Sequence, residues 1–178
     1  MRRFILPLCL AMASTLASAD EFPRAVDAAR FDLGGVKPGM SVAEAVDAAV
    51  NHLHIDKASV EFGDPSQPEK SPGAFRARNN SVRLTVNFSS APSGRVVVYS
   101  VRYTMKFTTE NLASMKALVL EKYGPPTNDM AITTTRSGWE WCQHPNRDSA
   151  PWCFGLQEPV LRYYDGTISL DDLSLAPK

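Results

Sequence analysis

Few residues in this 178-residue chain have the types and spacing that metal binding needs. His52 and His54 are two positions apart at the end of a predicted helix, so their side chains point in different directions. No Cys, Asp or Glu completes a familiar ligand pattern with them. Imidazole at a helix C-terminus is an ordinary arrangement, because positive charge is favoured there. We therefore expect no metal site and no cofactor.

A serine hydrolase would need a histidine beside an acid and a serine. Only His144 lies in a predicted loop, close to Asp148 and Ser149. A catalytic triad needs partners that rigid elements orient, and these three residues are neighbours in a single loop. The arrangement therefore does not predict hydrolysis.

A carboxylate pair for sugar chemistry would have to combine Glu140 with Asp165. No pattern brings these two residues together, and Asp165 has a turn to form with Gly166. The chain also lacks the nucleophile-elbow, zinc-protease, phosphate-loop and dinucleotide-binding motifs. We therefore predict that the protein is not an enzyme.

The N-terminal residues 1–19 read as a secretory signal. Two arginines precede an apolar run that is too short to span a bilayer, and Ala17-Ser18-Ala19 forms a cleavage site. Cys9 follows the bulky Leu8, which does not suit lipid attachment. We expect a periplasmic or secreted protein that starts near Asp20 and does not insert into the membrane.

Removal of Arg2 and Arg3 leaves 17 basic and 19 acidic residues, a formal charge of −2. This balance argues against nucleic-acid binding and against a polybasic membrane anchor. Removal of the predicted signal also takes away Cys9 and leaves Cys142 and Cys153. Two cysteines in an oxidising compartment favour one structural disulfide. A closed loop of roughly 12 residues contributes about 3 kcal/mol in the chain-entropy model.

Both cysteines lie in aromatic-rich stretches. If they are bonded across two antiparallel strands, Trp141 lies opposite Phe154. One face of that ladder then carries Trp139, Trp141, Trp152, Phe154 and Leu156, and the disulfide projects from the other face beside Glu140. Such an apolar face is more often core than ligand platform. It becomes a binding surface if helices cover only part of the sheet.

Two helices are predicted from their ends. The first starts at Ser41, where Ser41 and Glu44 form a capping box, and runs to about His52. The second starts near Thr108 or Thr109 and stops at Gly124-Pro125-Pro126. Residues 20–35 read as a terminal arm, and the proline-containing residues 63–80 read as a long surface loop.

Alternating residues predict strands at 82–88 and 96–107, joined as a hairpin. The expected inward set is Val82, Leu84, Val86, Phe88, Val97, Tyr99, Val101, Tyr103, Met105 and Phe107. Residues 136–138 read as a turn or bulge. A last hairpin over 160–170 turns at Asp165-Gly166, which pairs Tyr163 with Ile168.

These elements predict an α+β fold with two helices packed on an antiparallel sheet, in one domain over 20–178. A helix-then-strands plan is used twice, over 37–107 and 108–173. The helix start Lys37-Pro38-Gly39-Met40-Ser41-Val42-Ala43-Glu44 and the helix end Lys122-Tyr123-Gly124-Pro125-Pro126 resemble those of the β-lactamase inhibitory proteins and the small outer-membrane assembly lipoproteins. The resemblance implies a protein-binding role.

The predicted binding site lies on the outward side of the first hairpin, at Val96, Val98, Arg102 and Arg83, which are more apolar and more basic than a solvated strand requires. The expected function is an exported, non-enzymatic protein-binding module, such as an inhibitor or an envelope assembly factor, with a protein of the cell envelope as its partner. The alternative is a small-molecule or glycan binder with an aromatic-lined groove.

Overall fold

The computed structural model describes residues 24–63, 73–91, 93–106, 108–133, 136–146, 148, 153–164 and 166–177. The expectations for the signal 1–19, for residues 64–72 and for Phe107, Ser149, Trp152 and Asp165 lie outside these residues. The described elements are the 3-10 helices η1 (Ala28–Arg30) and η2 (Lys57–Ser59), the α-helices α1 (Val42–Leu53) and α2 (Thr109–Tyr123), and the strands β1 (Glu61–Phe62), β2 (Ala74–Arg78), β3 (Val82–Ser90), β4 (Val96–Met105), β5 (Asn128–Thr133), β6 (Arg136–Trp141), β7 (Pro159–Tyr164) and β8 (Thr167–Asp172).

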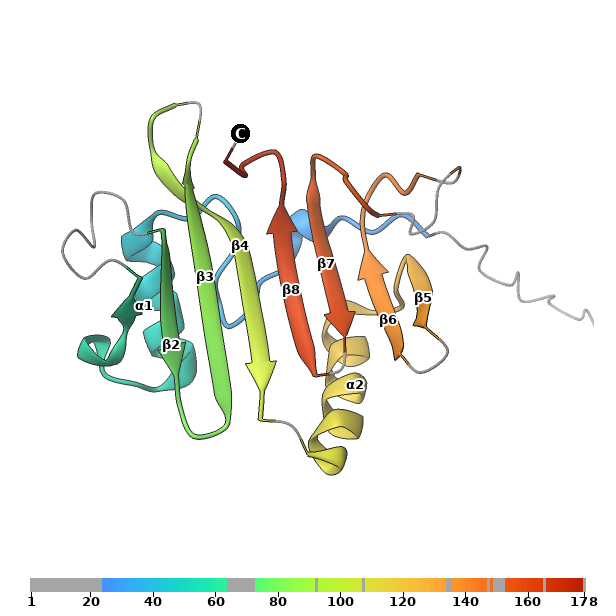
Figure 1. Cartoon of the computed structure of the whole chain (residues 1–178), viewed down its shortest axis with the longest axis horizontal. Coiled ribbons are helices and arrows are strands. Elements are labelled where there is room, and N and C mark those ends of the chain that lie inside the picture. The colour runs from blue at the N-terminus through green and yellow to red at the C-terminus, as the bar shows by residue number, and fades with distance from the viewer. Residues whose placement is uncertain are drawn as a thin grey trace, which may run out of the picture.

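The described strands form one antiparallel sheet in the order β1-β2-β3-β4-β8-β7-β6-β5 (Figure 1). Each half of the chain is a helix followed by four strands, and the two halves meet where β4 pairs with β8. The strand order is therefore symmetric about this seam. Both the predicted α+β class and the helix-then-strands plan used twice are confirmed.

The helix ends follow the sequence signals. The Ser41 side chain accepts a hydrogen bond from the Glu44 N–H, and the Glu44 carboxylate accepts one from the Ser41 N–H, so the capping box is present. α2 ends before Gly124, whose φ of 75° is the left-handed conformation that glycine adopts readily. No helix in the described ranges is long and apolar enough to cross a bilayer.

The core lies between the sheet and the two helices, which pack on the same side of it (Figure 1). α1 contributes small residues, Ala45 and Ala49, and this allows the helix to approach the sheet closely. The terminal-arm expectation is wrong for the described residues from 24 onward. Leu33 and Val36 are buried in the core, and Val98 of β4 exchanges backbone hydrogen bonds with Gly39 and Met40.

Two segments that were predicted to be loop or turn belong to strands in the structure. Ala74–Arg78 form β2 within the expected 63–80 loop, because Phe75 and Ala77 alternate into the core even though the segment is otherwise polar. Residues 136–138 belong to β6, where Gly138 pairs with Tyr164. A Cβ at Gly138 would clash with the Tyr164 ring, so glycine here permits close packing and does not mark a turn.

The last hairpin has the predicted register, with Tyr163 opposite Ile168. The predicted tryptophan ladder is wrong, because Trp141 pairs with Leu161 and not with Phe154. Phe154 lies in a turn and is 74% exposed. Trp139 and Trp141 are buried in the main core, so the core interpretation holds for these two residues.

Candidate functional site

The side of the sheet opposite the helices is uncovered over β2, β3 and β4 (Figure 1). We call this surface the open face and define it by the side chains that alternate away from the core: Arg76, Arg78, Arg83, Thr85, Arg102, Thr104, Thr167 and Ser169. A sheet with one solvated face has this polar alternation as a rule. Four of these eight side chains are arginines.

The strand register arranges the open face in two neighbouring rows. In one row, Thr85 lies between Arg76 on β2 and Arg102 on β4. The second row runs from Arg78 on β2 to Arg83 on β3. Adjacent strands are about 4.8 Å apart, so neighbouring side chains in the same row are close enough to interact. Four guanidinium groups thus share one patch of sheet.

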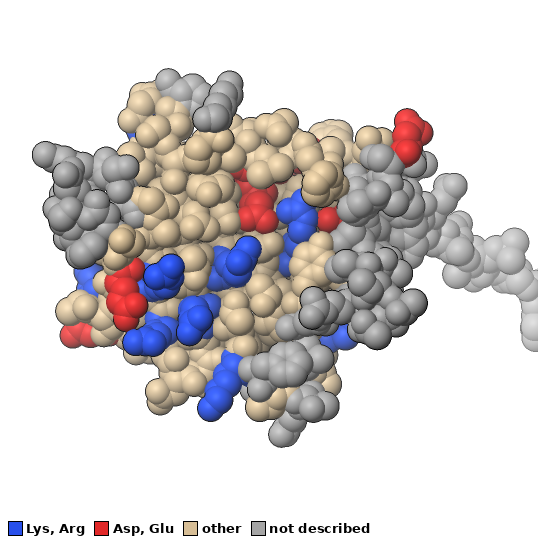
Figure 2. Space-filling model, viewed as in Figure 1, with Lys and Arg blue, Asp and Glu red and all other residues tan. Residues whose placement is uncertain are grey.

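Most of this positive charge is not neutralised locally. Arg78 forms an ion pair with Glu61, with 3.3 Å between Nη2 and Oε1, and both side chains are exposed. Arg76, Arg83 and Arg102 form no ion pair within the described ranges. Figure 2 shows the resulting cluster of Lys and Arg atoms over β2, β3 and β4. Glu61 offsets one of the four guanidinium charges, so the patch as a whole stays cationic.

Two of the four predicted binding residues are on this surface. Arg83 and Arg102 are exposed on the open face as expected. Val98 is fully buried in the main core and Val96 packs against that core, so their predicted place on the outer surface is wrong.

A β-bulge explains the error in β4. Asn87 pairs with Ser100 while Phe88 pairs with Val98, which leaves Tyr99 as an extra residue. Residues three apart in a regular strand face opposite sides, yet Val98 and Val101 both belong to the core. The bulge therefore reverses the alternation for the part of β4 that precedes it.

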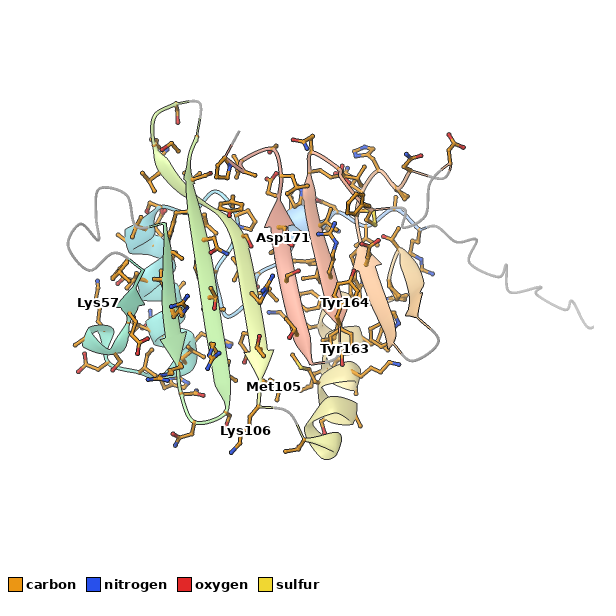
Figure 3. The ribbon with its side chains drawn as sticks, viewed as in Figure 1. Lys57, Met105, Lys106, Tyr163, Tyr164 and Asp171 are labelled. Atoms are coloured by element: carbon orange, nitrogen blue, oxygen red, sulfur yellow. A yellow bond between two sulfur atoms is a disulfide. The ribbon has the colours of Figure 1, made fainter. Side chains whose placement is uncertain are left out.

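A buried polar network borders the arginine rows on the side of β7. Glu140 of β6, 1% exposed, accepts a hydrogen bond from Arg162 of β7 at 3.0 Å between Oε1 and Nε. Arg162 also contacts Asp171 of β8, labelled in Figure 3, and the Ser169 hydroxyl donates to the same carboxylate oxygen. The carboxylates and the guanidinium satisfy one another, so this network has a structural role.

The network holds the disulfide segment against the sheet. Cys142 and Cys153 are bonded, with 5.9 Å between their Cα atoms. The Cys153 N–H donates to Glu140 and Arg162 donates to the Cys153 carbonyl. The cysteines form a separate cluster with Val160, apart from Trp139 and Trp141. The predicted position of the disulfide beside Glu140, away from Trp139 and Trp141, is confirmed.

Tyr164 lies at the edge of this network on the open side of β7 (Figure 3). Burial raises the pKa of its hydroxyl, and the negative charge of Glu140 raises it further. The Tyr164 hydroxyl is therefore a neutral hydrogen-bond donor at physiological pH.

Among the described residues considered for catalysis, His144 and Asp148 contact other groups and not each other. His144 Nδ1 lies 2.6 Å from Glu158 Oε2, while the Asp148 N–H bonds to Asn146. Glu140 is held by Arg162. The described residues contain no group of three or more His, Cys, Asp or Glu side chains that could hold a metal ion.

Sequence analysis missed Arg76 and Arg78, because it assigned their segment to a loop. The alternation of Phe75 and Ala77 with two arginines was the available signal, and it spans only four residues. The full patch depends on strand pairing between segments that are not adjacent in sequence.

The patch is suited to binding anions by charge-assisted hydrogen bonds, with the Thr85 hydroxyl between Arg76 and Arg102 and the Thr104 hydroxyl beside Arg83. Comparison with protein-family models, with curated proteins and with solved structures finds no match for this chain. The functional conclusion therefore depends on the geometry of the open face.

Proposed function

We propose that this chain is an exported, non-enzymatic binding module whose open face binds an acidic segment of a protein in the cell envelope. The observation that carries the proposal is the set of three exposed arginines, Arg76, Arg83 and Arg102, without a carboxylate partner in the described part of the chain. Guanidinium groups bind carboxylates in a bidentate geometry, and arginine is enriched at protein interfaces for this reason.

The spacing of the arginines supports a partner with several carboxylates. Arg76 and Arg102 are two strands apart, which separates their backbones by about 10 Å. An acidic protein segment can place successive carboxylates along both rows of the patch. Electrostatic attraction of this kind raises the association rate and selects the partner.

The overall charge favours a protein over a nucleic acid. The full chain has 19 basic and 19 acidic residues, so the positive charge is concentrated on one patch of a balanced molecule. Nucleic-acid-binding domains generally carry excess positive charge over a larger surface. A local acidic surface is the better complement to this patch.

The signal-like residues 1–19 and the Cys142–Cys153 disulfide support the proposed export, because disulfides persist in oxidising compartments. The helix-start and helix-end motifs that resemble those of β-lactamase inhibitory proteins and small assembly lipoproteins support a role as an inhibitor or assembly factor. A catalytic role is not part of the proposal, since no motif in the sequence suggests one.

The test uses residues 20–178 as immobilised bait in envelope extract. Three baits are compared: the unmodified chain, an Arg83→Glu/Arg102→Glu variant, and the control Arg30→Glu, which changes an exposed arginine in η1 behind the sheet. We expect a stoichiometric protein partner with the unmodified chain and the control, and its loss with the double variant. Its affinity should fall as salt is raised.

Equal recovery of the partner by all three baits would exclude the open face as the binding site. Displacement of the partner by single-stranded DNA at physiological salt would instead indicate a nucleic-acid site. Circular-dichroism melting of each bait checks that the substitutions leave the fold intact, because exposed residues usually change stability by less than about 0.5 kcal/mol.

A further inference from the structure

A cleft lies on the helix side of the sheet, on the opposite side from the open face. It is bounded by the end of α1, by α2, and by β4 and β8 beneath them, and it has a volume of about 160 Å³. Tyr103 and Met105 of β4 and Ile168 of β8 line it, so the cleft lies over the seam where these two strands pair. Leu33 and Gly34 line part of this seam.

The cleft has apolar walls. Met115 and Leu118 of α2 line it together with Met105, which Figure 3 labels at the end of β4. Leu118 is 56% exposed although it borders this cleft. An apolar cavity of about 150 Å³ is large enough to bind benzene, so this cleft can accept one aromatic ring. Methionine sulfur makes favourable contacts with aromatic rings, and two methionines are available here.

Polar groups are present at the same place. His52 of α1 and Tyr103 of β4 line the cleft, with their rings 6.1 Å apart. Within the described ranges, neither side chain forms a hydrogen bond with another protein group. Burial raises the pKa of the Tyr103 hydroxyl, which therefore remains a donor.

A cation completes the polar side of the cleft. Lys122 lines it, and its ammonium also contacts Asp32 with 3.0 Å between Nζ and Oδ1. Two of its three N–H donors go to the Asp32 carbonyl and carboxylate, and the side chain is 47% exposed, so one donor remains for another acceptor. No Asp or Glu is among the described residues that line the cleft. Asp32 offsets the charge of Lys122 beside the cleft, so an anion would be recognised by the remaining Nζ donor and by the Tyr103 hydroxyl.

We propose that this cleft binds a small aromatic carboxylate. The ring lies against Met105, Met115 and Leu118, and the carboxylate accepts hydrogen bonds from Tyr103 and Lys122. A mostly apolar pocket with a few convergent polar groups is the usual form of a small-molecule site. The site is on the other side of the sheet from the arginine patch, so it can be tested independently of the proposed protein partner.

The first experiment titrates 3-phenylpropionate into the mature chain labelled with ¹³C at the methionine methyl groups. Saturable chemical-shift changes are expected at Met105 and Met115, while Met40 serves as an internal reference outside the cleft. The neutral analogue 3-phenylpropanamide is titrated in parallel. The acid should bind at least about fivefold more tightly than the amide, because only the acid carries a charge complementary to Lys122.

Two matched variants of α2 test the location. Leu118→Glu places a carboxylate at the edge of the cleft, whereas Leu120→Glu changes an exposed leucine of the same helix that does not line it. We expect Leu118→Glu to weaken binding of the acid by about tenfold or more and Leu120→Glu to leave it unchanged. Both side chains are partly exposed, so both variants should remain folded.

The proposal is overturned if the methyl groups of Met105 and Met115 do not respond at millimolar acid, or if both variants weaken binding equally. Equal affinity for acid and amide would overturn the assignment of the ligand as a carboxylate. Tyr103→Phe gives a further check, since loss of the hydroxyl should weaken the acid complex while leaving the melting temperature unchanged.

Discussion

Arg78 of β2 and Arg83 of β3 lie directly opposite each other in the antiparallel register, both exposed on the open face. Like charges in directly opposed positions destabilise a sheet. Only Arg78 has an ion-pair partner in the described part of the chain, the exposed Glu61. Folding therefore gains nothing from this pair, and its presence is consistent with the proposed role of the patch in binding an acidic partner.

Arg83→Thr should raise the free energy of unfolding by roughly 0.2–1 kcal/mol at low salt, because it removes the repulsion from Arg78 and introduces a strand-favouring side chain. Urea unfolding at low and high salt measures the effect, which should shrink as salt screens the charges. Arg30→Thr is the control, since Arg30 contacts Asp27 and not another cation. Destabilisation by Arg83→Thr at low salt would contradict the interpretation that Arg78 and Arg83 repel each other.

Val98→Thr should lower the free energy of unfolding by about 1–3 kcal/mol, because the substitution places a hydroxyl in the fully buried core. The matched reverse change is Thr104→Val on the open side of the same strand, which should stay within about 0.5 kcal/mol of the unmodified protein. Thermal and urea unfolding compare the two. If the two variants were equally stable, the assigned bulge at Tyr99 would be wrong.

Glu140→Ala should destabilise the protein by about 3 kcal/mol or more, because it leaves the largely buried Arg162 without its closest carboxylate and removes an acceptor of the Cys153 N–H. Asp171→Ala should cost less, since the Asp171 side chain is 20% exposed and Glu140 remains. The comparison is made by denaturant unfolding of both variants. A larger loss for Asp171→Ala would contradict the described network.

Replacement of both Cys142 and Cys153 by alanine should lower the free energy of unfolding by about 3 kcal/mol, as loop closure predicts. Both cysteines are 0% exposed, so dithiothreitol should reduce them slowly unless denaturant is present. Mass spectrometry after alkylation, with and without denaturant, measures the thiols. Free thiols at both positions in the untreated protein would refute the disulfide.

Stability should depend on Asp32 in acid. Burial acts to raise the pKa of its carboxyl, but hydrogen bonds from Lys122 and the Gly35 N–H outweigh burial and hold the pKa below its ordinary value of 3.8. The folded state therefore binds this proton less readily than the unfolded state. The stabilisation is complete above pH 3.8 and is lost as pH falls through the lower, folded pKa.

Asp32→Asn removes this titration while keeping an oxygen that can accept from Gly35. The difference in unfolding free energy between the unmodified protein and Asp32→Asn should be constant near neutral pH and shrink below about pH 4. Urea titrations at several pH values measure it. A difference that grows as the pH falls would have the wrong sign for this carboxylate.

The sequence by itself determined the features that depend on residues a few positions apart. The capping box of Ser41 and Glu44, the end of α2 at Gly124 and the Tyr163–Ile168 register are local, because each is set by one turn of chain or one tight turn. The pairing of the two cysteines followed from there being only two after the predicted signal.

Only the tertiary structure decided which face of β4 each side chain occupies and which residues join the open face. Side chains alternate with a period of two, so the single extra residue Tyr99 moves Val98 from the expected surface into the core. Gly138 lies in a strand opposite Tyr164, whose ring occupies the space that a Cβ would need. Arg76 lies beside Thr85 only through the pairing of β2 with β3. Each of these facts depends on contacts between segments that are far apart in sequence, which local patterns do not encode.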